Sequence, residues 1–510
     1  MSAHLPILPI ALPMLIGALQ LLLERRGIVL QRTLAWIGLA GLLCLSIALL
    51  GLADGDTVVA YLVGDWPARL GITLVVDRLS AWMVLTTTLL ATACLLHAGS
   101  GWDRRAPHFH ALLQFLLMGL NGAYLTGDLF NLFVFFEILL AASYGLLLSG
   151  GRGGRMRVGF HYLVFNITAS TLFLIALGLI YGLLGTLNMA ELAVRVSDVA
   201  PQDRALVQSV AGLLLVVFCA KGAILPLYLW LPATYGRAQP AVSALFVIMT
   251  KVGLYSVLRV YTLLFGETAG ELSGFAWTWL LPAGIATSLM AALGTLAAVR
   301  LRILAGYLVL VSAGTLFVAF ALARADSIGA GLYYLAHSTF TGAALFLIVE
   351  LVRQRRITDR MNVVLPMARQ AVPGTLYILT AIAAIGLPPL SGFIGKFTLL
   401  AAVPEERIGW VWSTILLSSF FVMVAMARAG SKLFWIQPPP GSPSPGSSIK
   451  PRMGHRSELA AIILLLAYCV AMTVAAGPAL RYTMATGEQL VDPGNYIQAV
   501  RDKTPALRDP

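Results

Sequence analysis

Long apolar runs recur through this chain of 510 residues, and four of them carry a charged residue in their interior. The four residues are Glu137, Lys221, Lys251 and Lys396. A charge at membrane depth costs at least about 2.5–3.5 kcal/mol. Such a group is therefore expected to move ions or protons, or to pair with another group inside a helix bundle.

The composition is that of a polytopic, all-α membrane protein. Hydrophobic residues make up 59% of the chain and charged residues 11%, whereas about a quarter of the residues of a soluble domain are charged. The first apolar run lacks a basic leader and a small-residue cleavage site, so we expect it to be a retained helix. None of the four cysteines forms a CxxC pair, which argues against a disulfide framework or a zinc site.

A membrane-spanning helix needs about 20 apolar residues, and we identify about fourteen candidates in the sequence. They are residues 5–23, 32–53, 75–97, 109–127, 129–148, 158–184, 206–228, 240–264, 275–299, 303–323, 328–352, 374–400, 410–434 and 457–480.

The basic residues support this arrangement. With the N-terminus outside, the loops that face inside carry most of the 35 Lys and Arg residues. The outside loops carry only Arg69, Arg78, Arg195, Arg204, Arg324 and Arg407. This distribution follows the positive-inside rule, so we expect both termini outside. The net charge of +12 is then explained by cytoplasmic loops, and no nucleic-acid partner is expected.

The spans divide the chain into segments. We expect three spans in 1–105, a first five-helix repeat in 106–264, a second, inverted five-helix repeat in 265–436, a cytoplasmic Pro/Gly/Ser linker in 437–456, the last span in 457–480 and a polar outside tail in 481–510. Residues 53–71 hold a short alternating run with Asp and Pro, which predicts an outside hairpin.

Two of the charged spans, the seventh and the twelfth, are interrupted by proline. Pro226 follows Lys221, and Pro388 and Pro389 precede Lys396. Proline removes a backbone donor and breaks a helix. Interrupted helices at corresponding places in two halves indicate a transporter with repeats. The two spans lie five apart, an odd number, so the second repeat would be inverted.

Glu137 lies near the middle of its span, where an isolated ionised carboxylate is implausible. It must be protonated or paired, and Lys221 is the natural partner. Opening and closing such a pair would change the proton affinity of both members. This is the physical basis of a coupled proton switch.

Other polar residues extend the set. Lys251 follows Thr250, and His337 has Thr341 one turn further on; a histidine can relay protons through either ring nitrogen. His161 is a weaker candidate near the inside end of its span. Two further residues receive structural interpretations. Arg259 is expected to anchor its helix or to snorkel at the outer end of the span, and Asp128 to cap a helix.

The motifs of soluble enzymes are missing. The sequence has no P-loop, no zinc-protease motif, no serine-hydrolase elbow and no dinucleotide fingerprint. We therefore expect no cofactor and no metal site. The protein would be one component of a transporter rather than an enzyme, driven by an ion gradient or by a partner.

Three segments carry a resemblance to a known family. They are DLFNLFVFFEILLAASYGLLL (128–148), AKGAILPLYLWLPATYGRAQPAVSALFVIMTKVGLYSVLRV (220–260) and LPPLSGFIGKF (387–397). They resemble the D subunits of the multisubunit Mrp/Mnh/Pha cation:proton antiporters. That family is related to the antiporter-like, proton-pumping subunits of respiratory complex I.

The resemblance implies a hydrophilic axis along the membrane plane that comprises Glu137, Lys221, Lys251, His337 and Lys396. Two positions depart from the broader pattern, because Tyr228 and Thr341 stand where many relatives have a histidine or a lysine. The implied function is proton translocation within a Na⁺ or K⁺/H⁺ antiporter of a bacterial inner membrane. The implied partners are the other subunits, including a homologous large subunit, together with membrane lipid.

Two alternatives remain open at this point. The chain can belong to a redox-driven complex, such as complex I or a membrane-bound hydrogenase, that uses the same charged axis. It can also be a scaffold whose buried charges only fix helix packing.

Overall fold

The computed structural model describes most of the chain. The described residues are 4–55, 57–69, 71–150, 153–356, 358–362, 367, 370–436 and 456–505. Most of the predicted linker, residues 437–455, lies outside this set.

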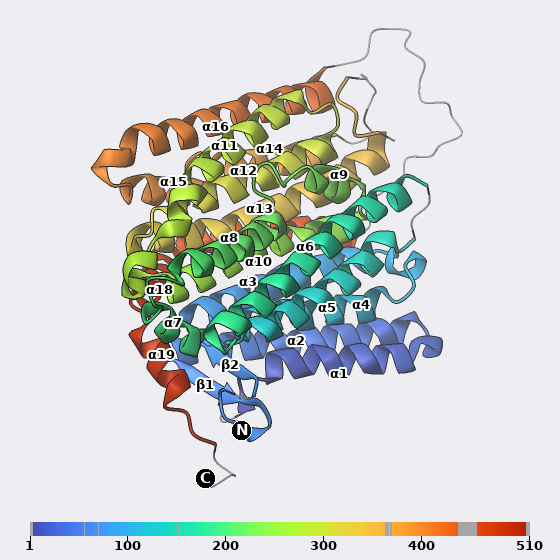
Figure 1. The fold of residues 1–510 in the computed structure, drawn as a ribbon. Helices are drawn as coiled ribbons and strands as arrows, with labels where there is room; N and C mark the ends of the chain where they lie inside the picture. The colour runs from blue at the N-terminus through green and yellow to red at the C-terminus, as the bar shows by residue number, and fades with distance from the viewer. Residues whose placement is uncertain are drawn as a thin grey trace.

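The described chain folds into long helices that lie side by side in one bundle, with one small hairpin (Figure 1). The helices are α1 (Leu8–Leu22), α2 (Ile28–Ala53), α3 (Arg78–Ala98), α4 (Phe109–Leu125), α5 (Leu129–Leu148), α6 (Gly154–Leu184), α7 (Met189–Ser197), α8 (Arg204–Gly222), α9 (Trp230–Arg237), α10 (Pro240–Leu264), α11 (Phe275–Ala297), α12 (Leu301–Ala321), α13 (Ala325–Arg356), α14 (Ala371–Ile385), α15 (Ser391–Ala401), α16 (Ile408–Gly430), α17 (Arg456–Val474), α18 (Ala476–Val491) and α19 (Gly494–Arg501). The strands are β1 (Val59–Leu62) and β2 (Thr73–Val76).

Length and composition make this a multi-pass membrane protein. Within the described residues, 11 helices are long and apolar enough to cross a membrane, and α1, α4, α14 and α15 are shorter apolar helices. Every predicted apolar run overlaps at least one helix. The runs 206–228 and 374–400 are each divided by an interruption, after α8 and between α14 and α15.

The burial of the helices separates the inside of the bundle from its periphery. The most apolar stretches of α10, α12 and α13 are 94%, 89% and 89% buried. Those of α2, α16 and α17 are only 33% buried, and large apolar side chains such as Trp36 and Trp410 are exposed on them. Charged residues on α10 and α13 are therefore enclosed by protein.

The predicted hairpin is present but lies further along the chain. Strands β1 and β2 pair antiparallel, with Val59 opposite Val76. Strand β2 therefore includes residues 75 and 76, which the hydropathy pattern assigns to the start of the third span. That helix, α3, begins at Arg78 because the Asp77 side chain accepts from Ser80 N and forms a capping box. The fold is thus helical with a single two-stranded sheet among the residues described.

The C-terminal tail is folded onto the bundle. It forms α18 and α19, and α18 packs against α13. Gln489 Oε1 accepts from the backbone N–H of Arg78 at 3.1 Å, and the hydroxyl of Tyr482 donates to the carbonyl of Arg78 at 3.1 Å. These bonds fix the tail to the beginning of α3.

Candidate functional site

Both helix interruptions bring an ammonium group to a helix C-terminus. Lys221 lies in the last turn of α8, which ends where Ala223 adopts the left-handed conformation. Lys396 lies on α15, and its Nζ donates to the carbonyl of Ile385, the last residue of α14, at 2.8 Å. Unpaired carbonyl groups give a helix C-terminus a partial negative charge. The second break therefore supplies a buried polar partner for Lys396, the carbonyl of Ile385.

The prolines lie inside these breaks. Pro226 falls between the end of α8 and the start of α9, and Pro388 and Pro389 fall between α14 and α15. The freed backbone is partly satisfied by neighbouring helices. Leu225 N, for example, donates to Thr287 Oγ1 of α11 at 2.9 Å. Irregular backbone at membrane depth is tolerated where protein encloses it in this way.

Lys221 is bound by neutral groups of α6 rather than by a carboxylate. Its Nζ donates to Asn166 Oδ1 at 3.2 Å and to Ser170 Oγ at 3.4 Å. It also lies 5.6 Å from the centre of the Phe136 ring. Asn166 and Ser170 are one turn apart on α6, where other polar residues keep them from standing out in the sequence.

The predicted ion pair between Glu137 and Lys221 is absent from the described part of the chain. Glu137 Oε1 is buried without a hydrogen-bond partner there, although the carboxylate is close enough for a coulombic interaction with Lys221. An unpartnered buried oxygen of this kind costs about 1–3 kcal/mol or more. The two groups are thus near neighbours whose direct bond is not formed in this structure.

Lys251 is completely enclosed on α10. Its Nζ donates to Ser312 Oγ of α12 at 2.7 Å, while the Ser312 hydroxyl donates to Val309 O at 2.7 Å. The neighbouring Thr250 has a different role, because its hydroxyl bonds to that of Tyr235 on α9 at 3.0 Å. Thr250 therefore ties α9 to α10 and does not contact the partner of Lys251.

A glycine sets the separation of the two lysine helices. A Cβ atom on Gly253 of α10 would lie 2.3 Å from Gly222 N at the end of α8. No larger residue fits at this position without moving the backbone. The close approach brings the end of α8, with Lys221, against the middle of α10, with Lys251.

His337 joins α13 to the second interruption. Its Nδ1 lies 2.8 Å from Ser391 Oγ of α15, and its Nε2 lies 3.1 Å from the carbonyl oxygen of Ala383 on α14. The hydroxyl of Thr341 lies 3.4 Å from the same Nε2. Both ring nitrogens therefore have partners, as a proton relay requires.

A small cavity connects three of the predicted residues. Ser312, His337, Thr341 and Lys396 line a space of about 30 Å³, and Ser312 is the residue that binds Lys251. One water molecule needs about 10–15 Å³, so the cavity has room for a water between these groups. Lys396 also donates to Ser419 Oγ of α16 at 2.8 Å.

The predicted residues thus fall into two neighbouring groups. Glu137 and Lys221 form the first, and Lys251, His337 and Lys396 form the second. The four cationic or basic side chains are buried, at 7% (Lys221), 0% (Lys251), 1% (His337) and 9% (Lys396) exposure. His161 belongs to neither group: it is exposed and lines a separate apolar pocket of about 540 Å³ with residues of α6 and α8.

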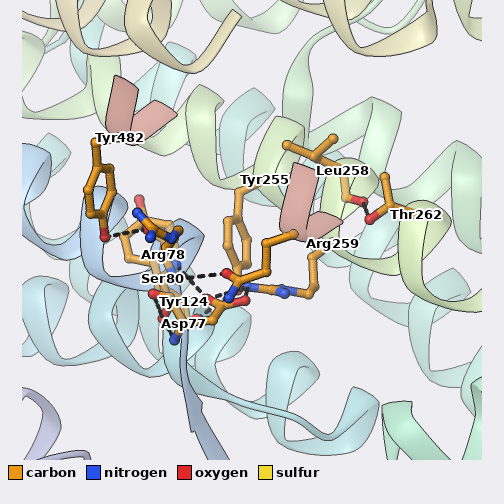
Figure 2. A network of polar contacts seen from close by, with 10 residues as sticks. Asp77, Arg78, Ser80, Tyr124, Tyr255, Leu258, Arg259, Thr262 and Tyr482 are labelled. Carbon is orange, nitrogen blue, oxygen red and sulfur yellow. Dashed lines mark hydrogen bonds and ion pairs between the residues drawn. The ribbon is translucent and has the colours of Figure 1, made fainter. Parts of the chain in front are cut away.

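The interpretation of Arg259 as a snorkelling residue was wrong. Figure 2 shows Arg259 of α10 reaching Asp77, and its guanidinium lies 2.6 Å from that carboxylate. Its Nε also donates to the hydroxyl of Tyr255 at 3.3 Å, and that hydroxyl donates to the carbonyl of Tyr124 at 2.6 Å. Lys251, Tyr255 and Arg259 follow one another at four-residue spacing and extend the polar face of α10.

The capping role predicted for Asp128 is correct, because its Oδ1 accepts from Asn131 N at 2.8 Å. This bond fixes the start of α5, the helix that carries Glu137.

The donor set does not resemble a metal site. Across the residues that the structure describes, no three His, Cys, Asp or Glu side chains lie together in a way that could hold a metal ion. The buried groups of the axis are amines, one imidazole and hydroxyls. Such groups can exchange protons with one another or with water.

Comparison with known proteins agrees with this arrangement. Residues 126–422 match the family described as NADH:quinone oxidoreductase/Mrp antiporter, TM. The matched region contains every residue of the two groups.

Relatives match along nearly the whole chain. A protein of Rhizobium meliloti (strain 1021), named as the D subunit of a probable K(+)/H(+) antiporter, is 39% identical over 98% of this chain and 97% of its own length. A Bacillus subtilis (strain 168) protein, named as the D subunit of a Na(+)/H(+) antiporter, is 34% identical over 97% of this chain and 98% of its own length. A chain of the Mrp complex from Dietzia sp. DQ12-45-1b has the same fold, with a TM-score of 0.88 at 26% identity over 98% of this chain and 99% of that one. The chain therefore belongs to the NADH:quinone oxidoreductase/Mrp antiporter family, among the antiporter D subunits.

Proposed function

We propose that this protein is the proton-translocating subunit of a multisubunit Na⁺ or K⁺/H⁺ antiporter. The observation that carries the proposal is the row of buried basic groups held only by neutral partners. Lys251, His337 and Lys396 contact hydroxyl and carbonyl oxygens. His337, Lys396 and Ser312, the partner of Lys251, line a shared cavity. A scaffold would neutralise such charges with carboxylates. The names of the relatives fit the same activity.

In this mechanism Glu137 controls the first lysine. The Lys221 proton is held by Asn166, Ser170 and the nearby carboxylate, and movement of Glu137 toward Nζ would form the missing ion pair.

Proton transfer would continue over Lys251 and His337 to Lys396. Thr341 assists by bonding His337, whereas Thr250 and His161 have no contact that assigns them a step.

The finer topology is part of the proposal. We infer fourteen spans in a bacterial inner membrane, with two inverted five-helix repeats in which the lysine-bearing breaks correspond. Both termini would lie outside. In support, Figure 1 shows α19 at the same end of the bundle as the β1–β2 hairpin, and the two are in contact. That hairpin follows the second predicted span, where the chain has returned to the side of its N-terminus.

A second candidate function has one specific observation in its favour. The matched family also includes NADH:quinone oxidoreductase subunits, so the same axis could serve a redox-driven complex. The genes that neighbour the gene for this protein would separate the antiporter function from the redox-driven one. An antiporter operon supplies small membrane subunits and a homologous large subunit, whereas a redox complex supplies iron–sulfur and flavin subunits.

The test uses vesicles that carry the complete set of subunits. Cation-driven ΔpH and cation flux are measured with the wild type and with Lys396→Ala. We expect the variant to assemble and to lose both signals. Wild-type transport in an assembled Lys396→Ala complex would refute the proposal.

A further inference from the structure

A second polar cavity lies away from the axis, at the end of the bundle that carries the basic loops. Its volume is about 260 Å³. The end of α3, the start of α10, the last turns of α13 and the start of α17 enclose it, with His97, Glu350 and Glu458 among the lining residues. Neither the axis nor the network around Arg259 uses these residues.

Several polar atoms of this cavity are buried without a partner among the described residues. They are Nδ1 of His97, Oε1 of Gln354 and Nε1 of Trp102. His97 is only 3% exposed. Each buried and unsatisfied atom costs about 1–3 kcal/mol, which an ordered water would offset. The cavity has room for several waters, because each needs about 10–15 Å³.

Among the described residues, the charges in the cavity leave one carboxylate, Glu458, without an ion-pair partner. Glu350 is paired with Arg353 at 3.0 Å, Arg155 donates to the carbonyls of Ser149 and Arg237, and Arg105 is exposed at the rim. Glu458 is 7% exposed and accepts a hydrogen bond from Gln354 Nε2 at 3.1 Å.

Two titratable groups are close enough to Glu458 for a coulombic interaction, Glu350 and His97. Glu350 is already paired with Arg353, so His97 is the group left to balance Glu458. The two side chains are not within ion-pair distance of each other in the described chain, so water can lie between them. A buried carboxylate and an imidazole in this relationship are neutralised most simply by sharing one proton. The next titratable group along α3 is the buried thiol of Cys94.

Hydroxyl groups continue from this cavity toward the axis. Thr92 is five residues before His97, about 7.5 Å along α3, and its Oγ1 lies 2.9 Å from the hydroxyl of Tyr468 on α17. The next residue, Cys469, has its Sγ 3.5 Å from Thr341 Oγ1. Thr341 in turn contacts His337. Polar groups of α3, α17 and α13 therefore lie between the cavity and the axis, and water would join His97 to Thr92 and Tyr468 to Cys469.

We propose that this cavity is the place where the protein takes up protons from the side of the basic loops. The His97–Glu458 pair is the acceptor, and the Thr92–Tyr468 contact passes the proton toward His337. The proton that forms an N–H bond on the His97 ring, balanced by the Glu458 carboxylate, is the proton then passed toward the axis. No other bond forms or breaks. This inference rests on the proposed antiport function.

The test compares two matched pairs of variants in vesicles with all subunits. His97→Gln and Glu458→Gln remove the proposed acceptor. His108→Gln and Glu24→Gln make the same chemical changes in another His–Glu pair, 2.9 Å apart and partly exposed, in the loops that flank α2 and α4. Antiport is measured against pH. We expect the first pair to shift the profile to lower pH, with a several-fold loss of rate on the alkaline side, and the second pair to follow the wild type.

Each outcome has a clear meaning. Profiles of His97→Gln and Glu458→Gln that coincide with the controls would overturn the inference, while Lys396→Ala tests the antiport function independently. If His97→Gln does not assemble, Thr92→Val and Tyr468→Phe decide, because both keep the shape of the contact. We expect slower proton uptake in both; wild-type rates in both would overturn the proposed route.

Discussion

Lys396 and Ile385 are joined by a hydrogen bond across the second helix interruption, from Nζ to the last carbonyl of α14, at 2.8 Å. The lysine therefore serves as a cap for the helix that precedes its own. Lys221 differs, because it lies on the helix before its interruption, in the last turn of α8, and its ammonium is bound by Asn166 and Ser170 of α6. At Lys396 the partial negative charge of a helix end stabilises the ammonium.

The first prediction concerns the removal of the Lys396 side chain. Lys396→Ala should abolish antiport, because the proposed axis would lose its last proton-carrying group. The α14 terminus would keep other bonds, since Gly386 N and Leu387 N donate to Ile382 O, so the complex should still assemble. ΔpH in vesicles and recovery of the purified complex are the two measurements. Lys432→Ala, at the end of α16, is the control and should transport normally.

A second prediction concerns the first group, Glu137 and Lys221. Glu137→Ala and Lys221→Ala should each abolish antiport in assembled complexes. Asn166→Leu should reduce it, because one of the two hydrogen bonds to Nζ is lost. Vesicle transport again gives the readout, with His161→Gln as a comparison from the exposed face of α6. Normal transport in Glu137→Ala would remove the carboxylate from the mechanism.

Within the described residues Lys251 makes one side-chain hydrogen bond, to the Ser312 hydroxyl, which gives a third prediction. Ser312→Ala should impair transport and destabilise the complex by about 1.5–3 kcal/mol, the usual contribution of a hydrogen bond to a charged group. Ser312→Thr keeps the hydroxyl and should retain most activity. Thermal unfolding in detergent and vesicle transport measure the two effects. Equal behaviour of the Ala and Thr variants would contradict the role of the hydroxyl.

The sequence was sufficient to pick out the buried charged residues of the candidate site. A lysine, histidine or glutamate within an apolar run stands out, and the nearby prolines indicated where helices break. Their partners could not be predicted. Ser312, Ser170 and Ser419 look in the sequence like Thr339 or Thr414, whose hydroxyls bond the carbonyl of their own helix four residues back. Only packing decides which hydroxyl turns to a neighbouring helix.

Arg259 illustrates the same limit. Its place near the end of an apolar run indicated an exposed cation, and its partner Asp77 lies 182 residues away in the sequence. The hairpin was also placed too early, because Val75 and Val76 are as apolar as the helix that follows. Strand pairing with β1 and the Asp77 cap, rather than hydropathy, set where that helix begins.

The buried Arg259–Asp77 pair supports a fourth prediction. Removing one partner leaves an unpaired buried charge, which costs about 3–5 kcal/mol. Asp77→Asn should therefore lower the thermal stability of the complex markedly, in part through loss of the α3 cap. Arg259→Met combined with Asp77→Asn should be less destabilising than the sum of the single changes. Additive losses would show that the two side chains are not coupled.

The loop between α3 and α4 makes a prediction about pH. The Asp103 carboxylate receives Arg32 Nε at 2.7 Å and Arg32 Nη2 at 2.8 Å, and lies 3.1 Å from His110 Nε2. Burial alone would raise the pKa of Asp103, but the bonds and charges of Arg32 and His110 outweigh it and lower this pKa to about 2. An Asp in an unfolded chain has a pKa of about 3.9.

Because the folded pKa of Asp103 is the lower one, this carboxylate stabilises the protein at pH values above the unfolded pKa. The contribution is lost as the pH falls through the folded pKa of about 2. Asp103→Asn should therefore destabilise the purified complex at pH 6–7, by about 1.5–3 kcal/mol for the lost charged bonds. The difference from the wild type should shrink as the pH is lowered toward 3. Melting temperatures of both proteins across this range measure it, and a difference that stayed constant with pH would mean that Asp103 is not ionised in the folded protein.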